Sequence, residues 1–276
     1  MNNITINWKE YFDNSCKGED MWGQYQTANG HLYIVADGVS NHAGTKTGGD
    51  VVRLITGRLE QDAAGIRHRG DLKDLLIEIN RESTKVNEGA FAAIAGILHR
   101  GDKLYAFSAG DVSIIAKKAN GKLILVLPLD LSMSREEAER LARSEIGTAV
   151  KNVEITADNY HLRAEQYLRH GLSNAIGLGE EFHVHDHKFN AKPGTALLIA
   201  SDGITDPFMK PQNENGSIAR ENALKLYQVM NSSNNAEEAA DAMEDLFWNT
   251  QVTERKKIKQ DDRTGIFIFM DAAENI

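Results

Sequence analysis

Residues 31–44 read HLYIVADGVSNHAG, and this stretch decides the fold assignment. Its first part, HLYIVA, is short, mostly apolar and rich in β-branched and aromatic side chains, and it stops at Asp-Gly, which predicts a strand that runs into a loop. The pattern recurs in TALLIASDGITD at residues 195–206 and, with the aspartate ahead of the strand, in QDDRTGIFIFM at residues 260–270. The three carboxylates concerned are Asp37, Asp202 and Asp261.

Carboxylates at strand ends can converge at one edge of a sheet although they are far apart in the sequence. A single Asp-Gly pair is also an ordinary turn, because Asp accepts local hydrogen bonds and Gly tolerates positive φ. Repetition beside apolar strands favours a cluster, and clustered carboxylates repel one another unless cations neutralise them. Ligands that are all oxygen suit Mn²⁺ or Mg²⁺. We therefore predict a metal centre.

The rest of the chain predicts an α+β layered fold. Apolar residues recur at helical spacing in two pairs of segments, and strand-length apolar runs separated by turn signals between the pairs favour an antiparallel meander at residues 92–129. The predicted helices cover residues 44–61, 72–86, 135–146, 217–230 and 236–248. A further strand is predicted at residues 182–189. The segment that follows the predicted helix at 135–146, up to about residue 172, reads as an irregular insertion.

Length and composition favour one domain spanning residues 1–276, with 41% apolar and 26% charged residues. The formal net charge of −9 makes nucleic acid an unexpected partner, because binding to a phosphate backbone needs a basic face. Cys16 is the only cysteine, which excludes an intramolecular disulfide and a cysteine-type metal site. No stretch approaches the ~20 apolar residues of a membrane span, and the first residues lack signal-peptide features. We expect a cytoplasmic protein, without a membrane partner and monomeric.

The ordered motifs resemble those of the metal-dependent serine/threonine phosphatases of type 2C, in particular bacterial members. The motifs are ADGVSNHAG (36–44), SAGDVS (108–113), NAIG (174–177), ASDGITD (200–206) and QDDRTGIFIF (260–269). The resemblance spans nearly the whole chain. It implies a four-layer α-β-β-α sandwich of two antiparallel sheets flanked by helix pairs, a metal site at one sandwich edge, and a flap at about residues 130–172.

The resemblance also implies a role for individual residues in a centre of two, or with a weaker site three, Mn²⁺ or Mg²⁺ ions. Asp37 would bridge two metals, the Gly38 carbonyl would contact one of them, and Asp202 and Asp261 would complete the pair. Asp20 matches the acidic pair of the family's N-terminal motif. Asp111 and Asp206 match positions that hold the third ion.

The chain departs from the family pattern at several positions, and two of them bear on the chemistry. Val39 stands where animal members have a histidine, and His42, which matches a histidine of many bacterial members, is the candidate proton donor to the leaving group. Ser15 stands where the family has its phosphate-binding arginine, and Lys17 is the candidate replacement. Lysine binds phosphate as a point charge without the arginine fork, so weaker substrate binding is expected.

Three functions follow from these residues. The first is hydrolysis of phosphoserine and phosphothreonine in proteins; the alternatives are a phosphatase-fold binding or regulatory module, and a two-metal hydrolase of small phosphate esters. Retention of the principal aspartates argues against a module without metal, because mutually repelling carboxylates have no other benefit. His183, His185 and His187 alternate along one predicted strand, and we attribute them to an exposed strand face and leave them out of the site.

Overall fold

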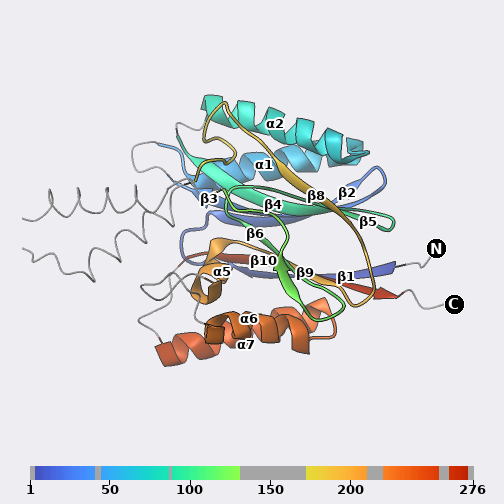
Figure 1. The fold of residues 1–276 in the computed structure, drawn as a ribbon. Coiled ribbons are helices and arrows are strands. Elements are labelled where there is room, and N and C mark those ends of the chain that lie inside the picture. The colour runs from blue at the N-terminus through green and yellow to red at the C-terminus, as the bar shows by residue number, and fades with distance from the viewer. Residues whose placement is uncertain are drawn as a thin grey trace, which may run out of the picture.

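Two five-stranded antiparallel sheets pack face to face, and helices cover the outer face of each (Figure 1). This computed structural model describes residues 4–40, 45–86, 89–130, 172–209, 220–254 and 261–272. The predicted four-layer α-β-β-α sandwich is therefore confirmed. The predicted helix at residues 135–146 and nearly all of the predicted flap at about 130–172 lie outside the described residues.

The first sheet has the strand order β2-β3-β4-β5-β8, and all of its neighbouring strands are antiparallel. Its strands are β2 (Asp20–Thr27), β3 (Gly30–Val39), β4 (Phe91–Arg100), β5 (Lys103–Ala109) and β8 (His185–Asn190). The helices α1 (Gly48–Asp62) and α2 (Arg69–Val86) cover its outer face, and a short 3₁₀ turn at Ala63–Gly65 joins them.

The second sheet has the order β1-β10-β9-β6-β7 and is also antiparallel throughout. Its strands are β1 (Ile4–Asp13), β10 (Arg263–Ala272), β9 (Ala196–Ala200), β6 (Ser113–Lys117) and β7 (Leu123–Leu125). The helices α6 (Arg220–Ser232) and α7 (Ala236–Glu254) cover its outer face, and the short α5 (Asp202–Met209) follows β9 (Figure 1).

Alternation of side chains along β3 explains how the layers are built. Leu32, Ile34 and Ala36 are buried against α1 and α2, whereas Tyr33 and Val35 are buried between the sheets. Successive strand residues point to opposite faces, so a strand that is apolar at every position must be covered on both sides. A third cluster of buried side chains packs the second sheet against α6 and α7.

The predicted meander at residues 92–129 is wrong at one point. β4 and β5 form a hairpin in the first sheet, but β6 leaves it and pairs with β9 in the second. The crossing falls at Gly110, whose φ of 106° suits glycine, and at Asp111. The segment between β5 and β6, whose sequence resembles a hairpin turn, therefore connects the two sheets.

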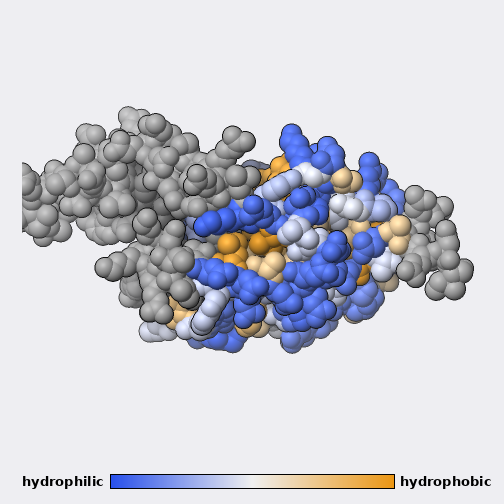
Figure 2. All heavy atoms as spheres, turned by 90° about the horizontal axis from the view of Figure 1, so that it is seen from below, coloured by the Kyte–Doolittle hydropathy of each residue, from blue (hydrophilic) through white to orange (hydrophobic). Residues whose placement is uncertain are grey.

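Other differences are smaller. Asp37 lies inside β3, two residues before its end, and not directly after the strand. The strand predicted at 182–189 is His185–Asn190, and β1, β2 and α5 were not predicted. Among the described helices, none is long and apolar enough to cross a membrane. Figure 2 views the molecule from the side of α6 and α7 and shows a mostly hydrophilic face around a smaller hydrophobic area.

Candidate metal centre

Asp37 and Asp20 form the centre of the candidate site. Antiparallel pairing of β2 with β3 places Asp20 directly opposite Asp37. Asp37 continues the row of Tyr33 and Val35, so its side chain faces the space between the sheets, and a directly paired residue shares that face. The first sheet thus supplies two neighbouring carboxylates at the sandwich edge.

Three more predicted residues reach this edge from other elements. Asp202 follows β9 as the first residue of α5, Asp261 lies two residues before β10, and Asp111 lies in the crossing from β5 to β6. The negative charges of Asp20, Asp202, Asp111 and Asp261 all act on Asp37. The fold therefore brings together carboxylates that the sequence separates by more than two hundred positions.

Electrostatics make this cluster unfavourable by itself. Burial raises the pKa of Asp37 well above its usual range, and the four neighbouring carboxylates raise it further. Burial also raises the pKa of Asp20 to about 7, against the opposing effect of the Ser201 and Thr264 hydroxyls. Both raised pKa values mean that the protein has too few positive charges and hydrogen-bond donors near Asp20 and Asp37 to stabilise their ionised forms.

The donor set fits a hard divalent cation. Asp20 is 2% exposed, and its Oδ2 atom is buried with no hydrogen-bond partner among the described residues. An unsatisfied buried carboxylate oxygen is costly, and a cation beside it would remove that cost as well as the repulsion around Asp37. The chemistry of the set, all carboxylate oxygens, suits Mn²⁺ or Mg²⁺.

The raised pKa of Asp20 gives a pH prediction for the metal-free protein. The folded state binds a proton that the unfolded state has released between pH 3.8 and about 7. The stabilisation that Asp20 contributes is therefore fully present below pH 3.8. It is lost as pH rises from there through about 7, at up to about 1.4 kcal/mol per pH unit. Thermal melts at a series of pH values, with chelator present, should show wild type losing stability relative to Asp20→Asn. A constant difference between the two across this range would contradict the shift.

Asp261 and Asp262 have different surroundings. Asp262 is 2% exposed, and its carboxylate accepts three backbone N–H groups, from Cys16 at 3.0 Å, Lys17 at 2.9 Å and Glu19 at 2.9 Å. It thus fastens the loop between β1 and β2 to the start of β10. Asp261 Oδ1 forms an ion pair with Lys17 Nζ at 2.9 Å. Asp262 is committed to the loop, which leaves Asp261 as the candidate ligand.

Gly38 and α1 approach each other closely behind the site. A Cβ atom on Gly38 would lie 2.5 Å from the Gly48 carbonyl carbon, so only glycine fits there. Thr47 caps the helix in a capping box with Asp50, and the Gly48 N–H donates to Ser40 Oγ at 3.0 Å. These contacts fix the backbone that carries Gly38.

The other residues that the sequence singled out, where the structure describes them, lie at different distances from solvent. Asp206 is 7% exposed and lies one helical turn beyond Asp202, on the same side of α5. Lys17 is half-exposed beside Asp261. Ser15 donates to Asp13 Oδ1 at 2.6 Å. His42 lies outside the described residues.

Two features of this region were not predicted from the sequence. The loop-fastening role of Asp262 has no local signal, because its partners are more than 240 positions away. The second is a contact of Asp130 with His183 and His185, two of the histidines assigned above to an exposed strand face. His187 is not part of that group.

Comparisons with known proteins concern the family and the fold. Residues 158–268 match the family model described as stage II sporulation protein E. A sequence search of curated proteins finds no significant match.

Solved structures match over nearly the full chain. The catalytic domain of the serine/threonine phosphatase PstP in complex with two manganese ions is 17% identical, with a TM-score of 0.63, and the match covers 97% of this chain and 99% of that one. Stp1, a serine/threonine phosphatase from Staphylococcus aureus, is 14% identical, with a TM-score of 0.65 and coverage of 96% and 95%. PppA, described as a regulatory component of T6SS in Pseudomonas aeruginosa, is 18% identical, with a TM-score of 0.60 and coverage of 98% and 100%. The chain therefore has the fold of the bacterial serine/threonine phosphatases, which confirms, at the level of the fold, the resemblance to type 2C carried by its motifs.

Proposed function

We propose that this protein is a metal-dependent phosphatase that hydrolyses phosphoserine and phosphothreonine in proteins. The observation that carries the proposal is the convergence of four carboxylates on the half-buried Asp37 in a fold shared with serine/threonine phosphatases. The manganese of the PstP structure supports Mn²⁺ or Mg²⁺ as the cofactor. A protein substrate is inferred from the activity named for those structures.

The proposed ligands are Asp37, the Gly38 carbonyl, Asp202 and Asp261, with Asp20 beside them and Asp111 and Asp206 for a third, weaker ion. When bound, two such cations supply an activated water and neutralise the phosphoryl oxygens. Asp37 lies between the sheets, and a cation would relieve the repulsion that raises its pKa. Asp262 holds the loop that carries Lys17 against Asp261, so an ammonium group stands at the edge of the same site.

Two residues are proposed to act on the substrate. Lys17 would bind the phosphate, because a cation that takes over the Asp261 carboxylate leaves the ammonium available to an anion. His42 would donate a proton to the departing serine or threonine oxygen, since a histidine titrates near neutral pH.

Residues 1–276 are proposed to form one catalytic domain, with a flap at about 130–172 that contacts the substrate. A reducing cytoplasm is the proposed location, because an exposed single cysteine, Cys16, needs no partner there. A signalling role would follow from removal of phosphate from proteins.

The test compares a phosphothreonine peptide with p-nitrophenyl phosphate, with and without Mn²⁺. Turnover of the peptide that requires Mn²⁺ or Mg²⁺ is expected. Faster turnover of the small ester at matched concentrations would favour the small-ester hydrolase. No turnover of either compound, with metal bound by calorimetry, would favour the binding module.

Lys17→Ala is expected to raise KM for the phosphopeptide by about three- to tenfold with a smaller change in kcat. The reason is that the proposed ion pair between the half-exposed Lys17 ammonium and the substrate phosphate is worth about 1 kcal/mol. Steady-state kinetics measures both constants. Lys9→Ala, on β1, is the matched control, because the Lys9 side chain is 44% exposed and that of Lys17 is 51% exposed. An unchanged KM in Lys17→Ala would remove Lys17 from the phosphate site.

A further inference from the structure

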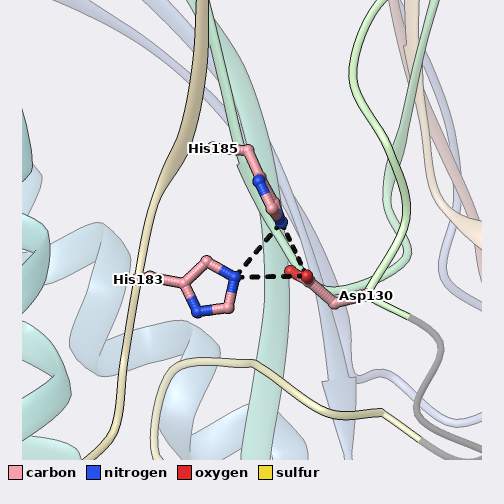
Figure 3. Close-up of side chains that lie close together, drawn as sticks. All are labelled: Asp130, His183 and His185. Carbon is pink, nitrogen blue, oxygen red and sulfur yellow. Dashed lines mark hydrogen bonds and ion pairs between the residues drawn. The ribbon is translucent and has the colours of Figure 1, made fainter.

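A second group of side chains with metal-binding atoms includes none of the carboxylates around Asp37. Asp130 follows β7, His183 precedes β8, and His185 is the first residue of β8; Figure 3 shows the three side chains pointing toward one another. His185 Nε2 lies 2.7 Å from Asp130 Oδ1, His183 Nε2 lies 3.4 Å from the same oxygen, and the two Nε2 atoms lie 3.2 Å apart. Three potential ligand atoms thus form one small triangle.

We propose that Asp130, His183 and His185 bind a late transition-metal ion of the zinc class. Zinc bonds of roughly 2.0–2.1 Å in a tetrahedral arrangement place neighbouring ligand atoms roughly 3.4 Å apart. Two sides of the triangle, at 3.2 and 3.4 Å, already have that length, and only the His185–Asp130 side, at 2.7 Å, must open. Two imidazoles and one carboxylate are a ligand set that zinc uses where a fourth position stays open.

Protons cannot satisfy the triangle as fully as a cation. A carboxylate oxygen only accepts, so each imidazole must present an N–H to Asp130 Oδ1 to bond with it. Once both do so, neither nitrogen has a lone pair for the other, and the 3.2 Å contact between the Nε2 atoms is left without a hydrogen bond. A cation within the triangle would accept a lone pair from all three atoms at once.

The carboxylate of Asp130 is held in place as metal ligands usually are. Asp130 is 7% exposed, and its second oxygen, Oδ2, accepts the Gly110 N–H at 2.9 Å and the Asn174 side-chain amide at 2.8 Å. These bonds leave Oδ1 directed at the histidines. Outer hydrogen bonds of this kind fix the orientation of ligands in metal sites.

Asn174 also positions one of the histidines. It is 1% exposed, its amide donates to the His183 carbonyl at 2.8 Å, and its Oδ1 accepts the His183 N–H at 3.3 Å. A single buried side chain therefore joins the backbone of His183 to the carboxylate of Asp130. The site is built by the fold and does not depend on the chance approach of exposed side chains.

The ligand class separates this site from the carboxylate centre. The triangle offers imidazole nitrogen, which favours zinc, cobalt, nickel or copper, whereas the oxygen ligands around Asp37 favour magnesium and manganese. The side chain of His183 is 57% exposed, so an ion can enter from solvent. The two sites should therefore fill independently when both classes of metal are present.

Titration of the full chain with Co²⁺ and Zn²⁺ tests the proposal. The protein is stripped with chelator and supplied with excess Mg²⁺ to fill the carboxylate centre. Co²⁺ is then expected to give the intense visible absorption of a four-coordinate ion, and Zn²⁺ to displace it. His183→Ala should weaken Zn²⁺ binding by calorimetry by about 100-fold or more, since loss of even an outer-shell group costs about 10–100-fold.

His187→Ala is the matched control, because His187 lies on β8, is exposed and is not part of the triangle. It should bind Co²⁺ and Zn²⁺ as wild type does. His183→Ala alters a largely exposed side chain, and a thermal melt without metal checks that it folds; a Zn²⁺-dependent rise in melting temperature in wild type but not in this variant is the second measurement. Absence of the cobalt band in wild type, or an equal band in folded His183→Ala, would overturn the proposal.

Discussion

Asp37→Asn is expected to lower the metal-dependent rate on the phosphopeptide by on the order of 10³-fold, because its carboxylate is a proposed ligand of the metal centre and metal catalysis contributes several kcal/mol. The same change should raise the melting temperature of the metal-free protein. Asp37 is surrounded by the charges of Asp20, Asp202, Asp111 and Asp261, so a neutral side chain of equal size removes repulsion at that point.

Asp37→Asn should thus lower the metal-dependent rate and raise the melting temperature of the metal-free protein. Kinetics with Mn²⁺ gives the rate, and thermal melts with chelator and with Mn²⁺ give stability; wild type should gain about 2.7 kcal/mol at a metal concentration 100 times its Kd, and Asp37→Asn little. Asp74→Asn, at an exposed position of α2, is the control and should leave both measurements unchanged. Full activity in Asp37→Asn would refute the metal assignment. A lower melting temperature of the metal-free variant would instead show that Asp37 stabilises the fold without a cation.

The residues that could be predicted are those with a strong local signal. β3 and β9 each contain an apolar run that is followed within two residues by an aspartate, and this local arrangement pointed to Asp37 and Asp202. The sequence of β1 also has the alternation typical of a strand, although no strand was predicted there. Its apolar residues Ile4, Ile6 and Trp8 pack between the sheets. Its pairing partner β10 is at the other end of the chain, so the strand is stabilised by distant residues.

The residues that could not be predicted depend on long-range pairing. Nothing local distinguishes SAGDVS from a hairpin turn, although the chain changes sheets there, because strand choice is decided by the partner and not by the turn. The approach of Asp130 to His183 and His185 likewise depends on the pairing of β8 with β5 and on Asn174. Alternating histidines alone are equally typical of an exposed strand.

The neighbours Asp261 and Asp262 offer the second large effect, on stability. Asp262→Ala should lower the free energy of unfolding by about 3 kcal/mol, because three N–H groups of the loop at residues 16–19 lose a charged acceptor and part of that cost is recovered by water. Asp261→Ala should leave the metal-free stability nearly unchanged, since its ion pair with the half-exposed Lys17 is worth little and its charge adds to the repulsion on Asp37.

Urea denaturation and Mn²⁺ calorimetry on the two variants separate a loop fastener from a ligand. Asp261→Ala should lose Mn²⁺ affinity by about 10- to 100-fold or more while it unfolds at nearly the wild-type urea concentration. Asp262→Ala should unfold at lower urea and, where folded, retain the larger share of Mn²⁺ affinity, because its carboxylate is occupied by backbone donors. The reverse pattern, with metal affinity lost in Asp262→Ala and stability lost in Asp261→Ala, would exchange their roles. Since the two residues are adjacent and chemically identical, such a difference must come from their surroundings: backbone donors around Asp262, and Lys17 and the charge of Asp37 beside Asp261.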